Sequence, residues 1–204
     1  MHPHSYARKL VPMVSEKLSL TTPHILRFYA KCFVFPYEEM QYELQHFFRT
    51  IERDSENTEE LAHVDQILNI VNMYQGMELK ELREEYVTLF SGNAQCPLLA
   101  HDFTAKFSIS YDSEIFVELI IDSDIPVNPD EPVDSISNYL EYFSILIEDL
   151  IDMGEEESRS TFFLREHIIP WILPFCEVLF RTSQISFYRE AAIGLSEYLS
   201  WLMD

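Results

Sequence analysis

Two Glu-x-x-His motifs are the residues of this chain whose types and spacing come nearest to enzyme chemistry. They are Glu43-Leu-Gln-His46 and Glu60-Leu-Ala-His63. Two such motifs on bundle helices, with a further glutamate from each of two other helices, hold di-iron or di-manganese centres in known helical proteins. A helical metal-binding enzyme of the di-iron type is therefore one hypothesis for this sequence.

The helical register of the first motif argues against that metal site. At about 100° per residue, His46 lies roughly 130° from the centre of the neighbouring apolar stripe. That stripe consists of Met40, Leu44, Phe47 and Ile51. A metal site in a bundle core needs its ligands to point inward, so we expect no metal, no other cofactor and no catalytic residue.

The remaining histidines form no better constellation. His2 and His4 lie close to the start of the sequence, and His101-Asp102 has no serine or cysteine partner at a readable spacing. His101 is therefore expected to be structural rather than catalytic. His167 lies four residues before Trp171, on the same helical face, and is expected to be a packing residue.

The chain carries an unusual charge. Its 204 residues include 35 acidic and 14 basic side chains, which give a net charge of −21 at pH 7. Such a field repels nucleic-acid phosphates and anionic lipid and attracts cationic partners. Solubility alone, or a high-salt or acidophilic habitat, explains the charge equally well. An acidic adaptor for a basic protein partner is a second alternative hypothesis.

Composition excludes several further classes of protein. Four glycines and no Gly-x-Gly or Walker pattern argue against a phosphate-binding loop. The three cysteines, at positions 32, 96 and 176, contain no Cys-x-x-Cys and suit a reducing compartment. The longest apolar run, residues 168–176, is too short to span a bilayer and contains two prolines. We therefore expect a soluble cytoplasmic protein without stable membrane insertion.

Apolar residues recur at helical spacing almost throughout, which predicts an all-α helical bundle. Thr22 is expected to cap the first helix, with Pro23 as its first residue. Residues 93–110 are expected to form a loop with a short helix at most. The helical pattern of 161–175 should kink near Pro170 or divide into two helices. The expected helices cover approximately residues 22–36, 37–53, 61–76, 79–92, 111–121, 136–150, 161–175 and 186–202.

The clearest linker spans residues 122–132. Three prolines in its last seven residues disfavour helix and favour a semi-rigid, extended segment. We expect residues 1–204 to form a single helical domain in which this linker acts as a hinge. Such a hinge permits either a compact monomer or a helix-exchanged dimer.

Two separated segments, 82–92 and 131–143, mix polar residues with large apolar ones and hold no plausible catalytic group. That mixture is typical of a peptide-binding groove. A structural interpretation is also open, because Asp134 precedes an apolar-periodic helix and can cap its free backbone N–H groups. Tyr86, Leu89 and Phe90 can likewise be ordinary core residues.

In combination, these segments resemble the signature blocks of the TorD/DmsD/NarJ family of redox-enzyme maturation chaperones. The first block is matched by Glu85-Tyr-Val-Thr-Leu-Phe90 with Gly92, and the family's proline-containing loop by Pro97 and Leu98. The second block is matched by Glu131, Pro132, Asp134, Ile136, Leu140, Glu141 and Tyr142. A weaker C-terminal match begins at Phe163-Leu-Arg-Glu-His167.

The chain departs from the family pattern at two positions of the second block. Ser135 stands where the family has a histidine, and Tyr139 stands where it has a glutamate. On this basis we expect a site without that imidazole and without proton chemistry. The departures are typical of a divergent member of the family.

The resemblance implies a cytoplasmic chaperone rather than an enzyme. It would bind the twin-arginine leader, or another terminal segment, of a molybdenum-containing oxidoreductase subunit during cofactor insertion and export. A leader of this kind has a basic region followed by an apolar stretch, so its receptor needs acidic groups beside an apolar groove. The expected peptide-binding residues are Tyr86, Leu89, Phe90, Pro97, Leu98, Asp134, Ser135 and Glu141.

Overall fold

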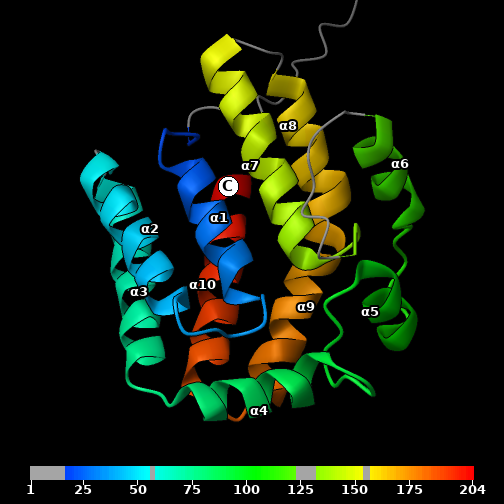
Figure 1. Cartoon of the computed structure of the whole chain (residues 1–204). Helices are drawn as coiled ribbons and strands as arrows, with labels where there is room; N and C mark the ends of the chain where they lie inside the picture. The colour runs from blue at the N-terminus through cyan, green and yellow to red at the C-terminus, as the bar shows by residue number, and fades with distance from the viewer. Residues whose placement is uncertain (1–16, 56–57, 123–131, 154–156) are drawn as a thin grey trace, which may run out of the picture.

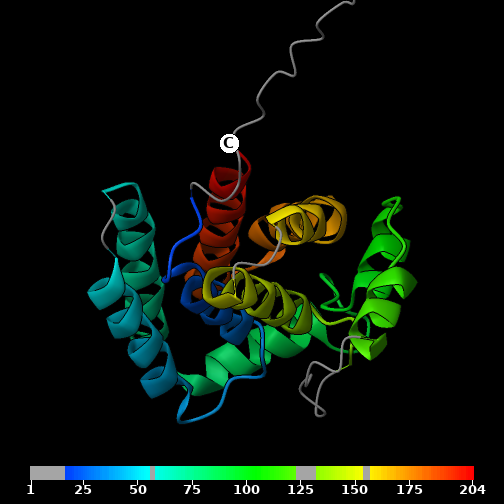
Figure 2. The same ribbon diagram turned by 90° about the horizontal axis from the view of Figure 1, so that it is seen from above.

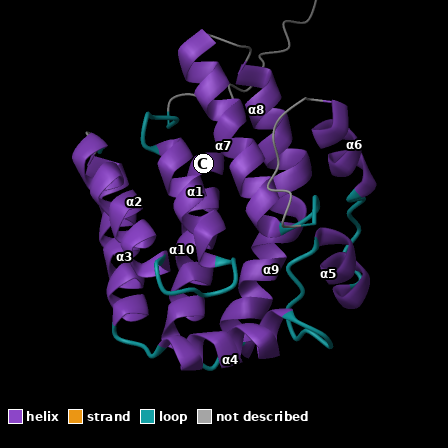
Figure 3. Ribbon diagram, viewed as in Figure 1, coloured by secondary structure: helices purple, strands orange, loops and turns teal. Residues whose placement is uncertain are grey.

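The computed structural model describes residues 17–55, 58–122, 132–153 and 157–204. Within these ranges every regular element is helical (Figure 3), and the predicted all-α class is confirmed. The elements are α1 Thr22–Cys32, α2 Met40–Asp54, α3 Thr58–Gln75, α4 Leu79–Phe90, α5 Ala100–Phe107, α6 Glu114–Asp122, α7 Ile136–Met153, α8 Glu157–Phe163, the π-helical turn η2 Leu164–Ile168, α9 Ile169–Thr182 and α10 Ser186–Met203.

The helices surround a central group made of α1, α7, α9 and α10. α1 packs most extensively on α7, and α9 on α10, while α2 and α3 pair at one edge of the molecule (Figure 1). α4 runs across the ends of the central helices, and α5 and α6 lie at the edge opposite α2 and α3 (Figure 2). Segments 90–102 and 132–138 therefore meet on the α5 side of the bundle.

α1 shows how local chemistry sets the bounds of an element. It begins at Thr22, with Thr21 in the cap position, so the expected cap is shifted by one residue. It ends at Cys32 rather than near Pro36. The chain leaves the helix through a tight last turn, in which the N–H groups of Phe33 and Val34 bond three residues back. The following proline disfavours helical backbone in the residue before it.

The apolar spacing of three and four residues predicts a stripe on α7 that faces other helices, made of Ile136, Leu140, Phe143, Ile147 and Leu150. Its first four members face the core, and Leu150 is partly buried. Ile136, Leu140, Phe143 and Ile147 are all fully buried. They share the interior with large aromatic side chains from α9 and α10, among which Trp171, Phe175, Tyr188 and Tyr198 are the largest. Aliphatic and aromatic burial on this scale stabilises the bundle by roughly 1.5–3 kcal/mol per side chain before chain entropy is counted.

Two irregular regions agree with their expected positions. Residues 93–110 contain the short helix α5 within loop structure, and the kink expected near Pro170 occurs as the π turn η2. Pro170 has no backbone N–H, and its ring would clash with the carbonyl of residue 166 in a regular α-helix. The wider π turn immediately before α9 accommodates that proline.

His2, His4 and most of the linker at 122–132 lie outside the described residues. None of the helices in the described ranges has both the length and the apolar character needed to cross a membrane.

Candidate functional site

The two segments singled out in the sequence are joined by a short backbone junction. The N–H of Ala100 donates to the carbonyl of Asp134 at 2.9 Å, and the N–H of Ile136 donates to that of Leu98 at 3.0 Å. Leu99 and Ser135 thereby form an isolated antiparallel bridge. This junction therefore holds the loop before α5 against the start of α7.

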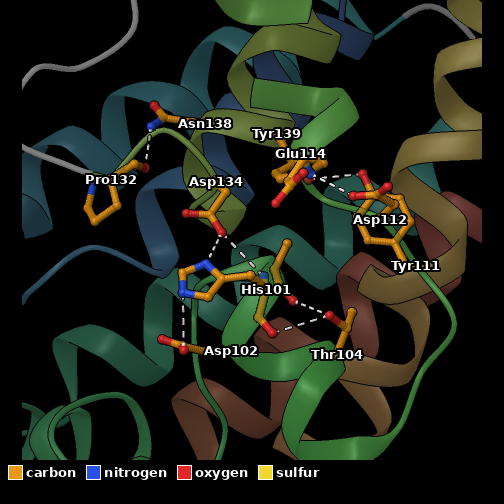
Figure 4. A network of polar contacts seen from close by, with 11 residues as sticks. His101, Asp102, Thr104, Tyr111, Asp112, Glu114, Pro132, Asp134, Asn138 and Tyr139 are labelled. Atoms are coloured by element: carbon orange, nitrogen blue, oxygen red, sulfur yellow. Dashed lines mark hydrogen bonds and ion pairs between the residues drawn. The ribbon is translucent and has the colours of Figure 1, made fainter. Parts of the chain in front are cut away.

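Asp134 caps α5 rather than the helix that follows it. Its carboxylate accepts the backbone N–H of His101 at 3.2 Å and contacts the imidazole Nδ1 of the same residue (Figure 4). The expectation that Asp134 caps its own helix is therefore wrong. Ser135 performs that role, because its hydroxyl accepts the N–H of Asn138 at 3.3 Å. A negative side chain at the start of α5 also complements the helix dipole.

The junction contains an imidazole despite Ser135. His101 comes from α5, and its second ring nitrogen, Nε2, lies 3.1 Å from a carboxylate oxygen of Asp102 (Figure 4). The hydrogen bond with Asp134 is the largest cause that raises the pKa of His101, with both carboxylates adding attraction. Position 135 lacks the family's histidine, and the imidazole at this junction comes from α5 instead.

A pocket of about 560 Å³ opens between the end of α4 and α5. Its wall includes three of the predicted residues, Phe90, Pro97 and Leu98. The other lining residues are Gly92, Asn93, Ala94, Leu99, Asp102 and Lys106. Gly92 has a φ of 62°, a left-handed conformation that favours glycine and turns the chain away from α4. We call this cavity the α4–α5 pocket.

The other predicted residues lie behind or beside this pocket. Leu89 is fully buried in the core, and Asp134 is only 8% exposed, so both support the wall from inside. The Tyr86 ring contacts Phe90 at a centroid distance of 4.9 Å. Glu141 is separate: burial raises its pKa, and the cations that oppose this shift are Lys31 and Arg27 of α1. Glu141 therefore faces α1 rather than the junction.

Comparison with known proteins places this arrangement in a family. The model of the family described as nitrate reductase delta subunit matches residues 51–177, which include both halves of the junction. The chain belongs to this family. Nitrate reductase delta subunit proteins are chaperones of the NarJ/TorD type, so the protein is a redox-enzyme maturation chaperone rather than a member of a catalyst family.

A solved structure has the same fold as this protein. It is a proposed redox enzyme maturation protein from Archaeoglobus fulgidus, 20% identical, with a TM-score of 0.57. The similarity covers 87% of this chain and 93% of the archaeal one. Among curated proteins, no sequence matches the chain.

The residues of the two Glu-x-x-His motifs lie in different environments. His46 is exposed, whereas His63 is buried and packs edge-on against Tyr198 at 5.1 Å. Glu43 pairs with Lys31 at 2.9 Å. No group of three or more histidine, cysteine, aspartate or glutamate side chains suited to a metal ion occurs in the part of the chain that the structure describes.

Proposed function

We propose that this chaperone binds the twin-arginine leader, or another terminal segment, of a molybdenum-containing oxidoreductase subunit in the α4–α5 pocket. Binding would hold the client subunit in the cytoplasm until cofactor insertion is complete and export can begin. The observation that carries the proposal is the junction: two segments of separate sequence blocks meet by backbone hydrogen bonds at the wall of one pocket.

The pocket's chemistry suits such a segment. Phe90, Pro97 and Leu98 offer an apolar wall, and the Asp102 side chain is 55% exposed beside it. An arginine of the ligand can pair with Asp102 while the following apolar residues pack on the wall. The net charge of −21 attracts the basic region from a distance.

Within this proposal, the predicted residues take different roles. Phe90, Pro97 and Leu98 contact the ligand, and Asp134 and Ser135 position the loop that carries Leu98. Leu89 and Tyr86 support the wall. Glu141 faces α1, so it contributes only to the general field. The single-domain organisation, and a monomer or helix-exchanged dimer, remain part of the proposal.

Calorimetry on the full chain tests the ligand. Synthetic leader peptides with Arg-Arg are expected to bind more tightly than matched peptides with Lys-Lys or Ala-Ala, because the guanidinium pairs with a carboxylate in two places. Selective binding that persists at raised salt distinguishes a chaperone from a purely electrostatic adaptor. Absence of binding to every leader encoded by the same genome would contradict the proposal.

Charge reversal tests the pocket. Asp102→Lys is expected to weaken Arg-Arg peptide binding by roughly five- to tenfold and to flatten its salt dependence. Glu84→Lys is the matched control, because Glu84 is 69% exposed on α4 outside the pocket and the net charge changes equally. Equal losses in the two variants would show that only the general field acts. Asp134 is less suitable for this test, since its loss also removes the cap of α5.

A further inference from the structure

A second pocket, of about 360 Å³, lies where α6 faces the π turn η2 and the start of α9. In Figure 1, α6 stands at the outer edge of the molecule, on the side of α8 and α9. We call this cavity the α6–η2 pocket. It is lined by Ser110, Tyr111, Asp112, Ile115, Leu119, Phe162, Glu166, His167 and Pro170.

Three large apolar side chains stand exposed at this one pocket. Ile115 is 48% exposed, Leu119 is 36% exposed and Phe162 is 59% exposed. Single exposed apolar residues are ordinary on a protein surface, but a group around a concavity marks an interaction site. The aliphatic face of α6 and the Phe162 ring together offer an apolar cleft for a side chain.

A buried histidine in the same pocket has an unused ring nitrogen. His167 is only 4% exposed, and its Nδ1 lies 3.3 Å from the hydroxyl of Tyr111. That hydroxyl lies 2.9 Å from the hydroxyl of Tyr139, which is fully buried. Among the described residues, Nε2 of His167 has no hydrogen-bond partner. A buried polar atom without a partner costs about 1–3 kcal/mol, so a ligand that satisfies it gains affinity.

The two tyrosines determine which nitrogen of His167 carries the proton. If Tyr139 donates to Tyr111, and Tyr111 donates to Nδ1 of His167, both tyrosine hydroxyl protons have an acceptor. If instead Nδ1 donates to Tyr111 and Tyr111 donates to Tyr139, the hydroxyl proton of the buried Tyr139 has no acceptor within this group. Burial lowers the pKa of His167, so the ring is neutral, and its single proton lies on Nε2. His167, which lines the pocket, therefore carries an N–H donor on a nitrogen that is almost fully covered in the unbound chain.

The π turn keeps this donor at the pocket. His167 belongs to η2, and Pro170, which requires the irregular turn, lines the same cavity. π turns in otherwise regular helices occur frequently at functional sites.

The charges around the α6–η2 pocket determine which kind of ligand group can accept the hydrogen bond from His167. Asp112 and Glu166 line the pocket, and no lysine or arginine appears among its described lining residues. A carboxylate or phosphate would be repelled by the two carboxylates, whereas a neutral backbone carbonyl would not. A basic residue next to that carbonyl would be attracted by both.

We propose that the α6–η2 pocket is a second docking site for the client subunit, taking an aliphatic side chain and the adjoining backbone carbonyl of a cationic segment. The side chain packs between α6 and Phe162, the carbonyl accepts from His167 Nε2, and a neighbouring lysine or arginine faces Asp112 and Glu166. The identity of the client rests on the proposed function, whereas the pocket's selectivity rests on its own residues.

Nuclear magnetic resonance of the full chain tests this site separately from the α4–α5 pocket. The probe is a capped peptide in which two arginines precede a run of leucines. We expect the free protein to show His167 with its proton on Nε2. We expect the probe to shift the methyl signals of Ile115 and Leu119 and the Nε2–H signal of His167. A matched probe with glutamates in place of the arginines is expected to leave these signals unchanged.

Variants on the exposed rim sharpen the test without disturbing the core. Phe162→Ala is expected to weaken the affinity measured at the Ile115 methyl by roughly tenfold. Tyr42→Ala, which removes a 72% exposed aromatic ring from α2, is the control and should have no effect. Glu166→Gln should weaken the same affinity, and Glu118→Gln on the exposed side of α6 should not.

Several results would overturn this second site. One is a proton on Nδ1 of His167, and another is a probe that shifts the Leu98 methyl of the α4–α5 pocket but not Ile115; the second leaves the proposed function intact. Shifts at Ile115 alone would support the second site and contradict the α4–α5 pocket. Signals of Ile115 that move with protein concentration in the absence of peptide would assign this face to a second copy of the chain.

Discussion

The central helices and the α5–α6 edge use the same residue types for different purposes. In the centre, Trp171, Phe143 and Phe175 are fully buried among side chains of other helices. At the edge, Ile115 of α6 and the neighbouring Phe162 of α8 remain about half exposed beside a pocket. Aromatic and aliphatic composition alone therefore does not separate core from recognition surface.

The difference lies in how many elements cover each side chain. α1 packs extensively on α7, and α9 on α10, whereas α5 packs on α9 through few residues, among them Phe103. A helix covered on one side leaves apolar residues at its rim, and pockets form there. We infer that the centre supplies stability and that the edge supplies binding, which can be tested by comparing variants from the two regions.

The largest expected effect comes from the centre. Trp171→Ala should lower the free energy of unfolding by about 3–5 kcal/mol, because the cavity cannot be refilled. The ring packs against Tyr139 at 5.0 Å and against Phe175 at 6.1 Å. Phe162→Ala at the edge should change stability by less than about 0.5 kcal/mol. Urea unfolding measures both values, and similar losses would contradict the division into two regions.

The contact between α10 and α1 gives the next largest effect. A Cβ atom on Gly194 would lie 2.4 Å from the hydroxyl of Tyr29, which is fully buried. Gly194→Ala should therefore lower the free energy of unfolding by about 1–3 kcal/mol through overpacking.

Gly76 offers a matched control for this substitution. The nearest atom to its added Cβ is a backbone oxygen at 3.5 Å, an ordinary contact. Gly76→Ala should leave stability almost unchanged in the same thermal or urea measurement. Because the lower entropy of the unfolded chain favours alanine at both positions, a loss at Gly76 equal to that at Gly194 would show that the close contact with Tyr29 does not set the cost.

The sequence predicted the parts of the centre that depend on local periodicity. The α7 stripe from Ile136 to Ile147 repeats every three or four residues, and all four of its predicted members in that span are buried. The irregularity at Pro170 was also predictable, since a proline cannot donate the backbone hydrogen bond of a regular helix. In both cases, the cause and its effect lie within one or two helical turns.

The junction could not be predicted in the same way. Asp134 and His101 are 33 residues apart, and no local pattern shows that one caps the helix of the other. The interpretation of Asp134 as a cap of its own helix followed from its position in the sequence. The starts of α5 and α7 both offer free N–H groups, and the sequence does not show which of them the carboxylate reaches. The hydrogen bonds that link His167 to Tyr111 and Tyr139 could likewise not be predicted, because the two tyrosines lie in other parts of the sequence.

Asp134 has an intermediate expected effect on stability. Asp134→Ala removes the acceptor for the N–H of His101 and should cost about 1 kcal/mol, the usual value for a helix cap. Asp134→Asn keeps an oxygen acceptor and should cost less. Chemical unfolding measures the global loss, and amide hydrogen exchange shows whether α5 opens first. Equal losses in the two variants would show that the charge, rather than the cap, is what matters.

The smallest expected effect is the dependence of stability on the charge of His101. Its pKa is raised in the folded state, chiefly by the hydrogen bond with Asp134. The stabilisation that charged His101 gives to the folded state is therefore complete below the unfolded pKa of about 6.5. It is lost as pH rises through the higher folded pKa. The His101 side chain is 58% exposed, so solvent screening keeps the effect below about 1 kcal/mol.

The opposite behaviour of other histidines requires a difference measurement for this effect. Burial lowers the pKa of His63 and of His167, so their contributions are lost as pH falls. Subtracting the unfolding free energy of His101→Gln from that of the unmodified chain, at each pH, removes these terms. The remaining difference should be largest at acid pH and shrink above neutrality. A difference that grows with pH would mean that His101 is stabilised in its neutral form, and the edge would then gain nothing from its carboxylate partners.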